Sequence, residues 1–333
     1  MAMVRQYAID FGTRTTQVWD PVAGEIYTEN TILAWDAVDH RLLSFGTETA
    51  EMVGKQPEYI EIINPVAHGV ISDYEAATLF IKQLLKKVAK KWWLIGPEVL
   101  VPVAYGTNQV EQKALIDAIR AAGARKVMLI DAPLATALGA RIPVAETFGN
   151  MILQLGDGMC EAAVMAMGGI VVAKSMRFGG YDMDLKLIEG LKKQHTLLIG
   201  DQLARSVREK YLYAIRPKHP ENIEISGRDT VYGLPKSITL NSVELYEMLK
   251  DGLAHIASLA VSVLSQTPPE LVCDIMDRGI VISGGLVNTK DLGKYLTATL
   301  NVAVHIAPEP ETCTIRGAGM ILENLEVYER AIR

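Results

Sequence analysis

The most constraining feature of the sequence is a match between two parts of the chain at an offset of 144 residues. Residues 8–13 (AIDFGT) fall on residues 152–157 (ILQLGD), and each copy has the pattern of a short apolar strand, a glycine-bearing turn and a second strand. A further glycine turn leads to a third strand in each copy. Two three-stranded meanders, each at the head of one half, predict a duplicated α/β domain. Strand–glycine–strand hairpins are common, so two unrelated hairpins are the alternative on this feature alone.

Helix and strand patterns alternate after the first copy. An amphipathic helix is predicted over 73–91 and a strand over 98–104. The next helix begins at Asn108, where Glu111 three residues later is typical of an N-terminal cap, and it ends at Gly123. This alternation predicts a parallel sheet, and the second half repeats it with a polar insertion. The other predicted elements are strands at 126–131 and 279–283, helices at 182–193, 201–213, 242–265 and 317–330, and a polar β stretch at 224–240.

The length and charge of the chain narrow the classes of protein to which it can belong. A chain of 333 residues exceeds one compact core and fits two domains. The formal net charge of −6 argues against nucleic acid as a partner, because phosphate binding depends on clustered positive charge. Its three cysteines lie far apart, which predicts buried thiols in a reducing compartment and no zinc site. Without a signal peptide or a long apolar run, the sequence predicts a cytoplasmic protein whose membrane contact is peripheral.

Three glycine-bearing turns follow predicted strands, at 10–16, 156–158 and 283–285. Glycine lets backbone N–H groups approach a polyphosphate, and the threonines of the first turn can add hydroxyl donors. Asp10 stands at a strand end, where a carboxylate can hold Mg²⁺ through water. An ordinary hairpin explains any one of these turns taken singly. The common nucleotide motifs G-x-x-x-x-G-K-[ST] and G-x-G-x-x-G are both missing from the sequence.

Taken together and in order, these turns resemble those of the superfamily of actin, heat-shock chaperones and sugar kinases. Within that superfamily, the sequence resembles the MreB family of bacterial actin homologues. The similarity covers nearly the whole chain and is carried by the segments AIDFGTRTT, TAEMVGKQP, GVISDYEA, residues 110–133, PVAETFGNMI, GGIVVAKS, GGYDMD, LLIGDQLA, GLPKSITL, TPPELVCDIMDRGIVISGG and IRGAGMIL.

The resemblance implies an α/β fold of the actin-like ATPase type, with two duplicated ribonuclease-H-like domains, each with a smaller subdomain, and a cleft between them. Domain I would cover 1–140, with a small subdomain at about 29–97, and a C-terminal helix at about 315–333 would complete it. Domain II would cover 141–314, with a small subdomain at about 182–240.

The cleft is implied to bind ATP or ADP with Mg²⁺, and Asp10 is the residue implied to hold the metal. In the helix that would lie near the adenine, the family usually has a lysine and a glutamate, whereas Arg208 and Lys210 stand at about those places here. The residues implied to contact the nucleotide are Asp10, Gly12, Thr13, Arg14, Thr15, Thr16, Gly156, Asp157, Gly158, Gly180, Asp184, Arg205, Arg208, Gly284 and Gly285.

The second glycine-bearing turn, which the resemblance implies to be a phosphate-binding loop, departs from the family pattern D-I-G-G-G-T-T. Gln154 replaces the acid that would pair with Asp10 around the metal. Asp157 places a carboxylate in the loop that should receive phosphate oxygens. Met159 and Cys160 remove two hydroxyl groups. These changes predict weakened nucleotide binding.

The position that activates water departs as well. The family has E-E-P, whose glutamate before proline positions the attacking water, and this chain has Asp131-Ala132-Pro133. Alanine cannot polarise water, and loss of such a group commonly lowers a rate by a factor of about 10² or more. A further glycine of the third turn is Leu286. We therefore assign no catalytic residue and expect slow or absent hydrolysis; the alternative is that Asp131 or Asp157 takes over.

An unusual run of large apolar residues follows the lysine-rich helix end: Lys90, Lys91, Trp92, Trp93, Leu94 and Ile95. Tryptophan favours the bilayer interface, and these lysines, with Lys86 and Lys87, can meet anionic headgroups. The run looks similar to a membrane-insertion loop of some MreB proteins. In the alternative, Leu94 and Ile95 begin the next strand and the tryptophans cover a core.

These observations lead to three functional hypotheses. In the first, the chain polymerises head to tail into filaments on the anionic inner face of the cytoplasmic membrane and organises cell shape or envelope synthesis, with envelope-synthesis membrane proteins as partners. In the second, it is a nucleotide-insensitive pseudo-actin that modulates a competent MreB paralogue. In the third, it is an active actin-like ATPase or a kinase of the same superfamily. That the chain polymerises is implied by the resemblance alone.

Overall fold

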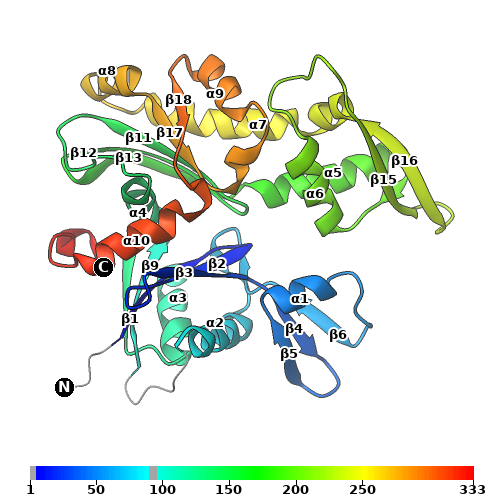
Figure 1. The fold of residues 1–333 in the computed structure, drawn as a ribbon, viewed down its shortest axis with the longest axis horizontal. Helices are drawn as coiled ribbons and strands as arrows, with labels where there is room; N and C mark the ends of the chain where they lie inside the picture. Colours follow the sequence, from blue (N-terminus) through cyan, green and yellow to red (C-terminus); the bar gives the residue numbers. More distant parts are fainter. Residues whose placement is uncertain (1–4, 90–95) are drawn as a thin grey trace.

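The computed structural model describes residues 5–89 and 96–333, which fold around two five-stranded sheets of the same topology (Figure 1). In each sheet three consecutive antiparallel strands form a meander, and the first of them pairs in parallel with the fourth strand, which pairs in parallel with the fifth. The duplicated meander predicted from the self-match is therefore confirmed. The first sheet consists of β1 (Gln6–Phe11), β2 (Thr15–Asp20), β3 (Glu25–Asn30), β9 (Glu98–Val103) and β10 (Lys126–Asp131). The second consists of β11 (Asn150–Leu155), β12 (Cys160–Ala166), β13 (Gly169–Met176), β17 (Ile280–Ser283) and β18 (Val304–Ile306).

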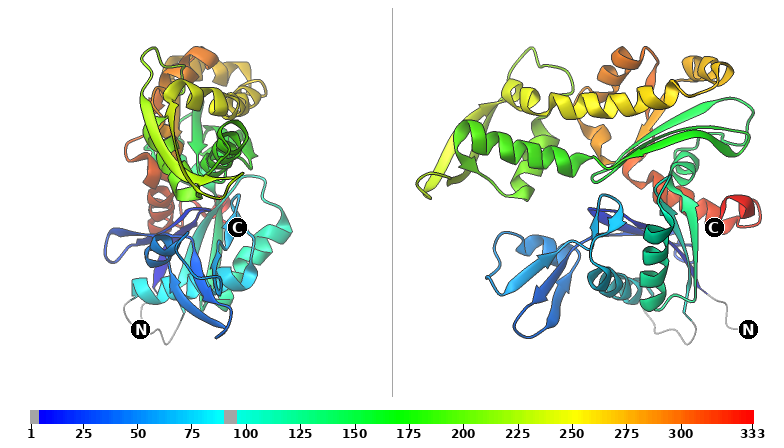
Figure 2. Two further views of the ribbon diagram at one scale, coloured as in Figure 1. Left: turned by 90° about the vertical axis from the view of Figure 1, so that its right-hand side faces the viewer. Right: turned by 180° about the vertical axis from the view of Figure 1, so that it is seen from behind.

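The helices lie in layers against these sheets (Figures 1 and 2). One apolar core joins the outer face of the first sheet to α2 (Tyr74–Ala89) and α3 (Gln109–Ala121). Another joins the second sheet to α5 (Gly180–His195), α7 (Ser242–Leu264), α8 (Pro269–Arg278) and α9 (Leu292–Leu300). A third core lies between the sheets and contains α4 (Ala132–Gly139) and α10 (Cys313–Glu323). The inner faces of both sheets are thus turned toward one shared layer.

Each half also carries a smaller set of elements to one side of its sheet; most of them form the outer parts of the two lobes, and the hairpin at residues 66–71 of the first set lies nearer the middle of the molecule (Figure 2). The first set comprises β4 (Leu33–Asp36), β5 (Arg41–Phe45), α1 (Thr47–Met52), β6 (Ile60–Ile63), β7 (Val66–Ala67) and β8 (Val70–Ile71). The second comprises α5, β14 (Leu197–Leu198), α6 (Asp201–Tyr211), β15 (Asn222–Asp229) and β16 (Pro235–Asn241). Short 3₁₀ turns lie at Gly285–Asn288, Pro310–Thr312 and Glu329–Ala331.

The start of α3 confirms the predicted N-cap. The Asn108 side chain accepts a hydrogen bond from the Glu111 backbone N–H at 2.9 Å, and the Glu111 carboxylate accepts one from the Asn108 N–H at 3.3 Å. Two otherwise unsatisfied N–H groups at the helix end are paired in this way.

The C-terminal helix differs from the expectation. A helix over 315–333 or 317–330 was predicted, whereas α10 runs over Cys313–Glu323 and turns follow it. Gly317, expected at the start of the helix, lies inside it, because α10 crosses α4 with backbone against backbone. A Cβ on Gly317 would be 1.7 Å from the Ala135 carbonyl oxygen, and one on Gly139 would be 1.8 Å from the Cys313 carbonyl oxygen. Only glycine permits this crossing, which packs α10 directly against α4 in the layer between the sheets.

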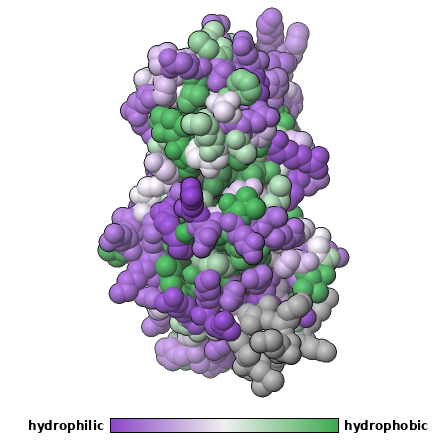
Figure 3. Space-filling view, turned by 90° about the vertical axis from the view of Figure 1, so that its left-hand side faces the viewer, coloured by the Kyte–Doolittle hydropathy of each residue, from purple (hydrophilic) through white to green (hydrophobic). Residues whose placement is uncertain are grey.

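A waist separates the two lobes when the molecule is seen from the side that carries the end of α10 (Figure 3). Hydrophobic residues reach the surface on both lobes of this face, among hydrophilic ones. Within residues 5–89 and 96–333, no helix combines the length and apolar character needed to cross a bilayer.

Candidate functional site

A cavity of about 410 Å³ lies between the two lobes, at the ends of the central strands of both sheets. The first loop (residues 10–16) enters it from the first sheet and the second loop (residues 156–158) from the second. Of the residues predicted to contact nucleotide, twelve line this cavity: Asp10, Gly12, Thr13, Arg14, Thr15, Gly156, Asp157, Gly158, Arg205, Arg208, Gly284 and Gly285.

Three of the predicted residues do not line the cavity. Thr16 is fully buried with its hydroxyl 2.8 Å from that of Thr31, because its side chain points to the opposite face of β2 from Thr15. Asp184 is buried behind the second loop, where it accepts hydrogen bonds from the Arg208 guanidinium at 2.6 and 3.2 Å. Gly180 lies beside this pair, and a Cβ there would be 2.8 Å from an Asp157 carboxylate oxygen.

The two loops turn in the same way. A Cβ on Gly12 would be 2.6 Å from the carbonyl oxygen of Thr15, and one on Gly156 would be 2.7 Å from that of Met159. Gly158 approaches the first loop, since a Cβ there would be 2.3 Å from the Thr13 hydroxyl oxygen. Each glycine is therefore required by a close approach, as in loops whose backbone can come close to an anion.

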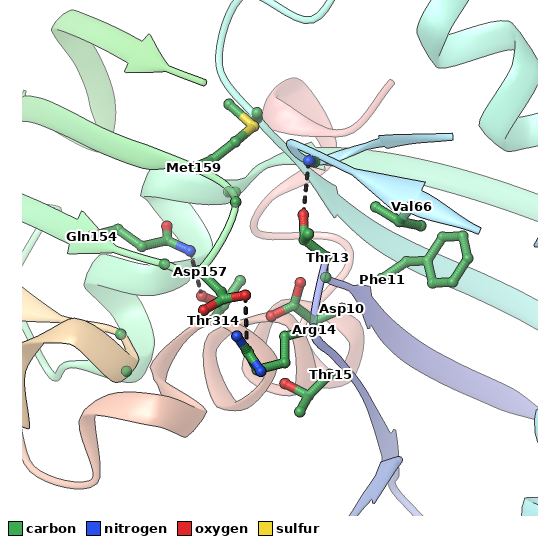
Figure 4. A pocket seen from close by; sticks show the side chains of 18 of the residues that line it. Asp10, Phe11, Thr13, Arg14, Thr15, Val66, Gln154, Asp157, Met159 and Thr314 are labelled. Carbon is green, nitrogen blue, oxygen red and sulfur yellow. Dashed lines mark hydrogen bonds and ion pairs between the residues drawn. The ribbon is translucent and has the colours of Figure 1, made fainter. Parts of the chain in front are cut away.

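An ion pair joins the two loops across the cavity (Figure 4). Arg14 Nε lies 2.8 Å from an Asp157 carboxylate oxygen, and both side chains are about four-fifths buried. The same guanidinium donates to Asp184 at 3.3 Å, and Arg208 lies 4.0 Å from Asp157. Two arginines and two aspartates thus form one network that ties the first sheet to the second half of the chain. The sequence identified all four residues but not their pairing.

A short hairpin, β7–β8, covers the loops on one side. The Gly69 N–H donates to the Thr13 hydroxyl at 3.0 Å, which the close-up of the cavity shows as a dashed line (Figure 4). The His68 ring Nδ1 lies 3.2 Å from the carbonyl oxygen of Gly158. The hairpin therefore contacts both loops, and the Thr13 hydroxyl, which accepts the bond from Gly69, keeps its proton free to donate.

Acid and amide side chains face each other in pairs across the central strands. Asp10 on β1 is directly opposite Gln17 on β2, and Gln154 on β11 is directly opposite Glu161 on β12. Directly opposed residues of antiparallel strands project from the same face. All four line the cavity. A shift of 144 residues places Asp10 on Gln154 and Gln17 on Glu161, so the acid of one pair corresponds to the amide of the other.

Glu161 is a residue of the site that the sequence interpretation missed. It is almost fully buried, and one carboxylate oxygen accepts hydrogen bonds from the Tyr105 N–H and the Ser175 hydroxyl, each at 2.8 Å. Burial raises its pKa to about 7, and the charges of Asp131 and Asp10 add to the rise. Burial alone raises the pKa of Asp10 to about 6. The self-match at the offset of 144 residues is the sequence signal that could have indicated Glu161, because it aligns Glu161 with Gln17.

The position of the missing acid is occupied by a fixed amide. Gln154 Nε2 donates to the Thr314 hydroxyl at 3.1 Å, and the Thr136 hydroxyl donates to Gln154 Oε1 at 2.8 Å. These threonines belong to α4 and α10, so the amide links the second sheet to the layer between the sheets. Ala132 lines the cavity with its methyl group, while Asp131 does not line it and is ion-paired with Arg333.

The proposed membrane residues Lys90, Lys91, Trp92, Trp93, Leu94 and Ile95 lie outside the described residues. The neighbouring Lys87, expected to meet headgroups, is instead committed to the protein. Its ammonium group lies 2.6 Å from the buried Glu29 carboxylate and 5.5 Å from the centre of the Tyr27 ring. The helix pattern did not reveal this, because Glu29 is 58 residues away in the sequence.

The chain is similar to known proteins over nearly its whole length. The family model described as MreB/Mbl protein matches residues 4–330. The chain is 34% identical to the cell shape-determining protein Mbl of Bacillus subtilis over 322 residues, which are 97% of each chain. It is 33% identical to the cell shape-determining protein MreB of Escherichia coli over 326 residues, 96% of this chain and 94% of that one.

Solved structures share the whole fold. The structure of MreB5 of Spiroplasma citri bound to ADP has a TM-score of 0.91 and 26% identity, covering 98% of this chain and 99% of that one. The same protein bound to AMPPNP has a TM-score of 0.92 with 99% of each chain covered. A MamK double helical filament has a TM-score of 0.80 over 96% of this chain and 99% of that one, and at 18% identity it shows the fold alone. The predicted actin-like fold is confirmed.

Proposed function

The chain belongs to the MreB/Mbl family, and on that premise we propose that it is a cytoskeletal protein that polymerises head to tail into filaments and organises cell shape or envelope synthesis. The observation that carries this proposal is the similarity to cell shape-determining proteins over nearly the whole chain. The likeness to the subunit of a MamK filament supports assembly. Head-to-tail contacts are open-ended, so they produce a filament and not a closed dimer.

We assign the nucleotide site to the cavity between the lobes, with domain I proposed at 1–140 and domain II at 141–314. The twelve predicted residues that line it support this assignment, as do the two glycine-bearing loops, which turn alike. The similar MreB5 was solved with ADP and with AMPPNP. The ligand class is therefore ATP or ADP, with the phosphates toward the first and second loops and the base toward Arg205 and Arg208.

The metal expected with the nucleotide is Mg²⁺, and Asp10 fits the requirement for a ligand. Its carboxylate points into the cavity (Figure 4) and makes no hydrogen bond or ion pair with any described residue. An ion bound there would neutralise phosphate charge. Gln154 contributes no charge, and its amide is held by two threonines.

Hydrolysis in this site is proposed to be weak or absent. Ala132 presents only a methyl group to the cavity, at the place where the family has a water-positioning glutamate. The nearest acid in sequence, Asp131, is ion-paired with Arg333 away from the cavity lining. Asp157, the other acid considered as a substitute, is held by Arg14. These contacts favour a filament protein over an ordinary ATPase or a kinase.

A second candidate function is that of a pseudo-actin, insensitive to nucleotide, that modulates a competent MreB paralogue. The observation that favours it is the ion pair between Arg14 and Asp157, because a carboxylate of the chain itself occupies the region between the phosphate loops. In this case the two lobes would be joined without any ligand.

Membrane attachment is proposed through residues 90–95, on the inner face of the cytoplasmic membrane, with envelope-synthesis membrane proteins as further partners. Adjacent tryptophans and lysines favour an anionic bilayer surface. A filament would carry many such segments, so weak single contacts would sum to strong binding.

Negative-stain electron microscopy on anionic liposomes, with and without Mg-ATP, tests the proposal. We expect membrane-bound filaments from the wild type. The double variant Trp92→Ser/Trp93→Ser should form the same filaments without lipid but leave the liposomes bare. Filaments that persist on liposomes in the variant would contradict the membrane role. If no filament forms under any condition, the pseudo-actin is the better proposal, and the search moves to its competent partner.

A further inference from the structure

We propose that Arg14, Asp157, Asp184 and Arg208 form an ionic latch that holds the two lobes together in the absence of nucleotide, and that a phosphate-bearing ligand releases this latch as it binds. The latch itself requires neither a nucleotide nor a polymer, whereas its release rests on the nucleotide site proposed above. The inference goes beyond both candidate functions, because it makes the ligand an agent that loosens the lobes.

Arg14 belongs to the first lobe, and both of its acidic partners belong to the second (Figure 4). Its Nε lies 2.8 Å from an Asp157 carboxylate oxygen, and its Nη2 lies 3.3 Å from an Asp184 carboxylate oxygen. The side chains of Arg14 and Asp157 are about four-fifths buried, and that of Asp184 is almost completely buried. Solvent and salt screen such a contact much less than they screen an ion pair on the surface.

Arg208 makes the two acids of the second lobe a fixed receptor for Arg14. Its side chain is buried, it donates to the Asp184 carboxylate at 2.6 and 3.2 Å, and its Nη2 lies 4.0 Å from Asp157. Two guanidinium groups and two carboxylates therefore balance in charge. If the lobes moved apart, two largely buried carboxylates would share one cation, and a buried charge that loses its partner is strongly unfavourable.

The backbone on each side transmits this contact to its lobe. In the first lobe, the Thr31 N–H at the end of β3 donates to the carbonyl oxygen of Arg14 at 2.8 Å. In the second lobe, the Tyr181 N–H in the first turn of α5 donates to the carbonyl oxygen of Asp157 at 2.9 Å. Both loops are thus fastened to neighbouring elements of their own lobe, so a separation of the guanidinium from the carboxylates moves the lobes and not the loops alone.

Two contacts nearer the surface also join the lobes. Gln202 Nε2 on α6 donates to the Ala50 carbonyl oxygen on α1 at 2.5 Å, which is a single neutral hydrogen bond. Arg177 pairs with Glu111 at 2.5 Å, but about half of the Arg177 side chain is exposed, and exposed ion pairs contribute little to stability. These two contacts support closure less than the latch does, because neither is a buried ion pair.

The position of the latch sets it against a phosphate-bearing ligand. A phosphate group between the first and second loops would meet the Asp157 carboxylate and would compete with it for the Arg14 guanidinium. Thermodynamic linkage makes this competition reciprocal: the factor by which the latch weakens the binding of the ligand is the factor by which the bound ligand weakens the latch. The ligand therefore loosens the lobes of this chain, whereas a ligand that displaced no such pair would draw them together.

Double electron–electron resonance between two spin labels on the full chain reports the separation of the lobes. The labels are attached at Glu58→Cys, beside β6, and at Thr239→Cys on β16, which are exposed positions in the outer parts of the two lobes (Figure 1). A Cys273→Ser background removes the exposed native thiol. The protein is kept below the concentration at which sedimentation detects a polymer.

Without ligand, we expect one narrow distance distribution when the latch is intact. Arg14→Gln should broaden this distribution and lengthen its mean by more than about 2 Å. The matched control is Arg125→Gln, which breaks an ion pair with Glu98 inside the first lobe and should change neither quantity. Mg-ADP should lengthen the mean distance when the latch is intact but not in Asp157→Asn, which has no carboxylate at this position to displace.

The outcomes separate this inference from the proposed function. A distribution that Arg14→Gln leaves unchanged would overturn the latch. Mg-ADP that binds, as calorimetry detects, yet narrows or shortens the distribution would overturn the release. If Mg-ADP binds neither to the chain with its latch intact nor to Asp157→Asn, the nucleotide assignment fails, and the ligand-free comparison still decides the latch. Thermal melting verifies folding; if Arg14→Gln does not fold, Asp157→Asn replaces it in that comparison, since asparagine keeps the size of the side chain.

Discussion

Asp157 lies in the second loop with its carboxylate 2.8 Å from the Arg14 guanidinium of the first loop. A phosphate group entering between the loops would meet this negative charge and would find the nearest guanidinium already engaged. Replacing Asp157 by asparagine removes the repulsion, keeps the size of the side chain and releases Arg14 to bind phosphate. We therefore expect Asp157→Asn to strengthen the binding of Mg-ADP, although most substitutions in a binding loop weaken it.

The size of the effect follows from the geometry. Two unit charges about 4 Å apart interact by about 4 kcal/mol at an effective dielectric constant of about 20. Asp157 is about one-fifth exposed, so solvent and salt reduce this value. Arg14 also keeps its contact with Asp184 at 3.3 Å, which offsets part of the gain. A net gain of about 1–2 kcal/mol remains, which is about a five- to thirty-fold lower Kd.

Isothermal titration calorimetry with Mg-ADP measures this directly, and a double-mutant cycle identifies the cause. Arg14→Gln alone should weaken binding. In the Arg14→Gln background, Asp157→Asn should gain less than it does in the wild type, because there is no guanidinium left to release. Refutation would be an Asp157→Asn variant that is folded yet binds Mg-ADP no more tightly than the wild type, since Asp157 would then not compete with phosphate.

Three further predictions test other parts of the structure. Gly317→Ala should lower the free energy of unfolding by about 3 kcal/mol in urea titrations, because its Cβ would meet the α4 backbone. The control Gly293→Ala in α9, where a Cβ would have nothing within 4 Å, should leave the free energy of unfolding unchanged or raise it by about 0.5–1 kcal/mol. Equal effects of the two substitutions would refute the packing argument. Burial raises the pKa of Glu161 from 4.5 to about 7, so the folded chain binds more protons in that window and its unfolding free energy should fall as pH rises through it. Glu161→Gln should flatten this fall by roughly 2–3 kcal/mol between pH 5 and pH 8, and an unchanged slope would assign it to other groups. The double variant Gln154→Asp/Ala132→Glu should raise phosphate release from ATP by about 10²-fold, since both residues line the cavity. Nucleotide binding without any gain in phosphate release would contradict the roles given to these positions.

Much of the fold was predictable because its signals are local. The strand–glycine–strand copies gave the meander of each sheet, and the N-cap at Asn108 set the start of α3. Most of the cavity lining was predictable for the same reason, since glycine turns at strand ends place the loops at one edge of each sheet. Local patterns failed at α10, where Gly317 marks a crossing with α4 and not a helix start.

The charges of the site were less predictable, because their partners are distant in the sequence. Lys87 belongs to an exposed face by periodicity, yet it is paired with Glu29 from β3. Arg14 and Asp157 were both candidates for phosphate contact, and only the three-dimensional structure reveals that they contact each other. A helical or strand period indicates which face a residue occupies but not which opposite charge another segment brings to it.

Gln154 illustrates how the two kinds of information combine. From the sequence, this position lost the acid that pairs with Asp10, which predicts a cleft with one carboxylate fewer. In the structure, Glu161 is directly opposed to Gln154 on the neighbouring strand and lines the same cavity, so two carboxylates from two sheets still face it. The amide at 154 instead fixes the second sheet to α4 and α10 through two threonines. The departures at residues 132 and 154 therefore do not leave the cavity without acids, because Asp10 and Glu161 both line it.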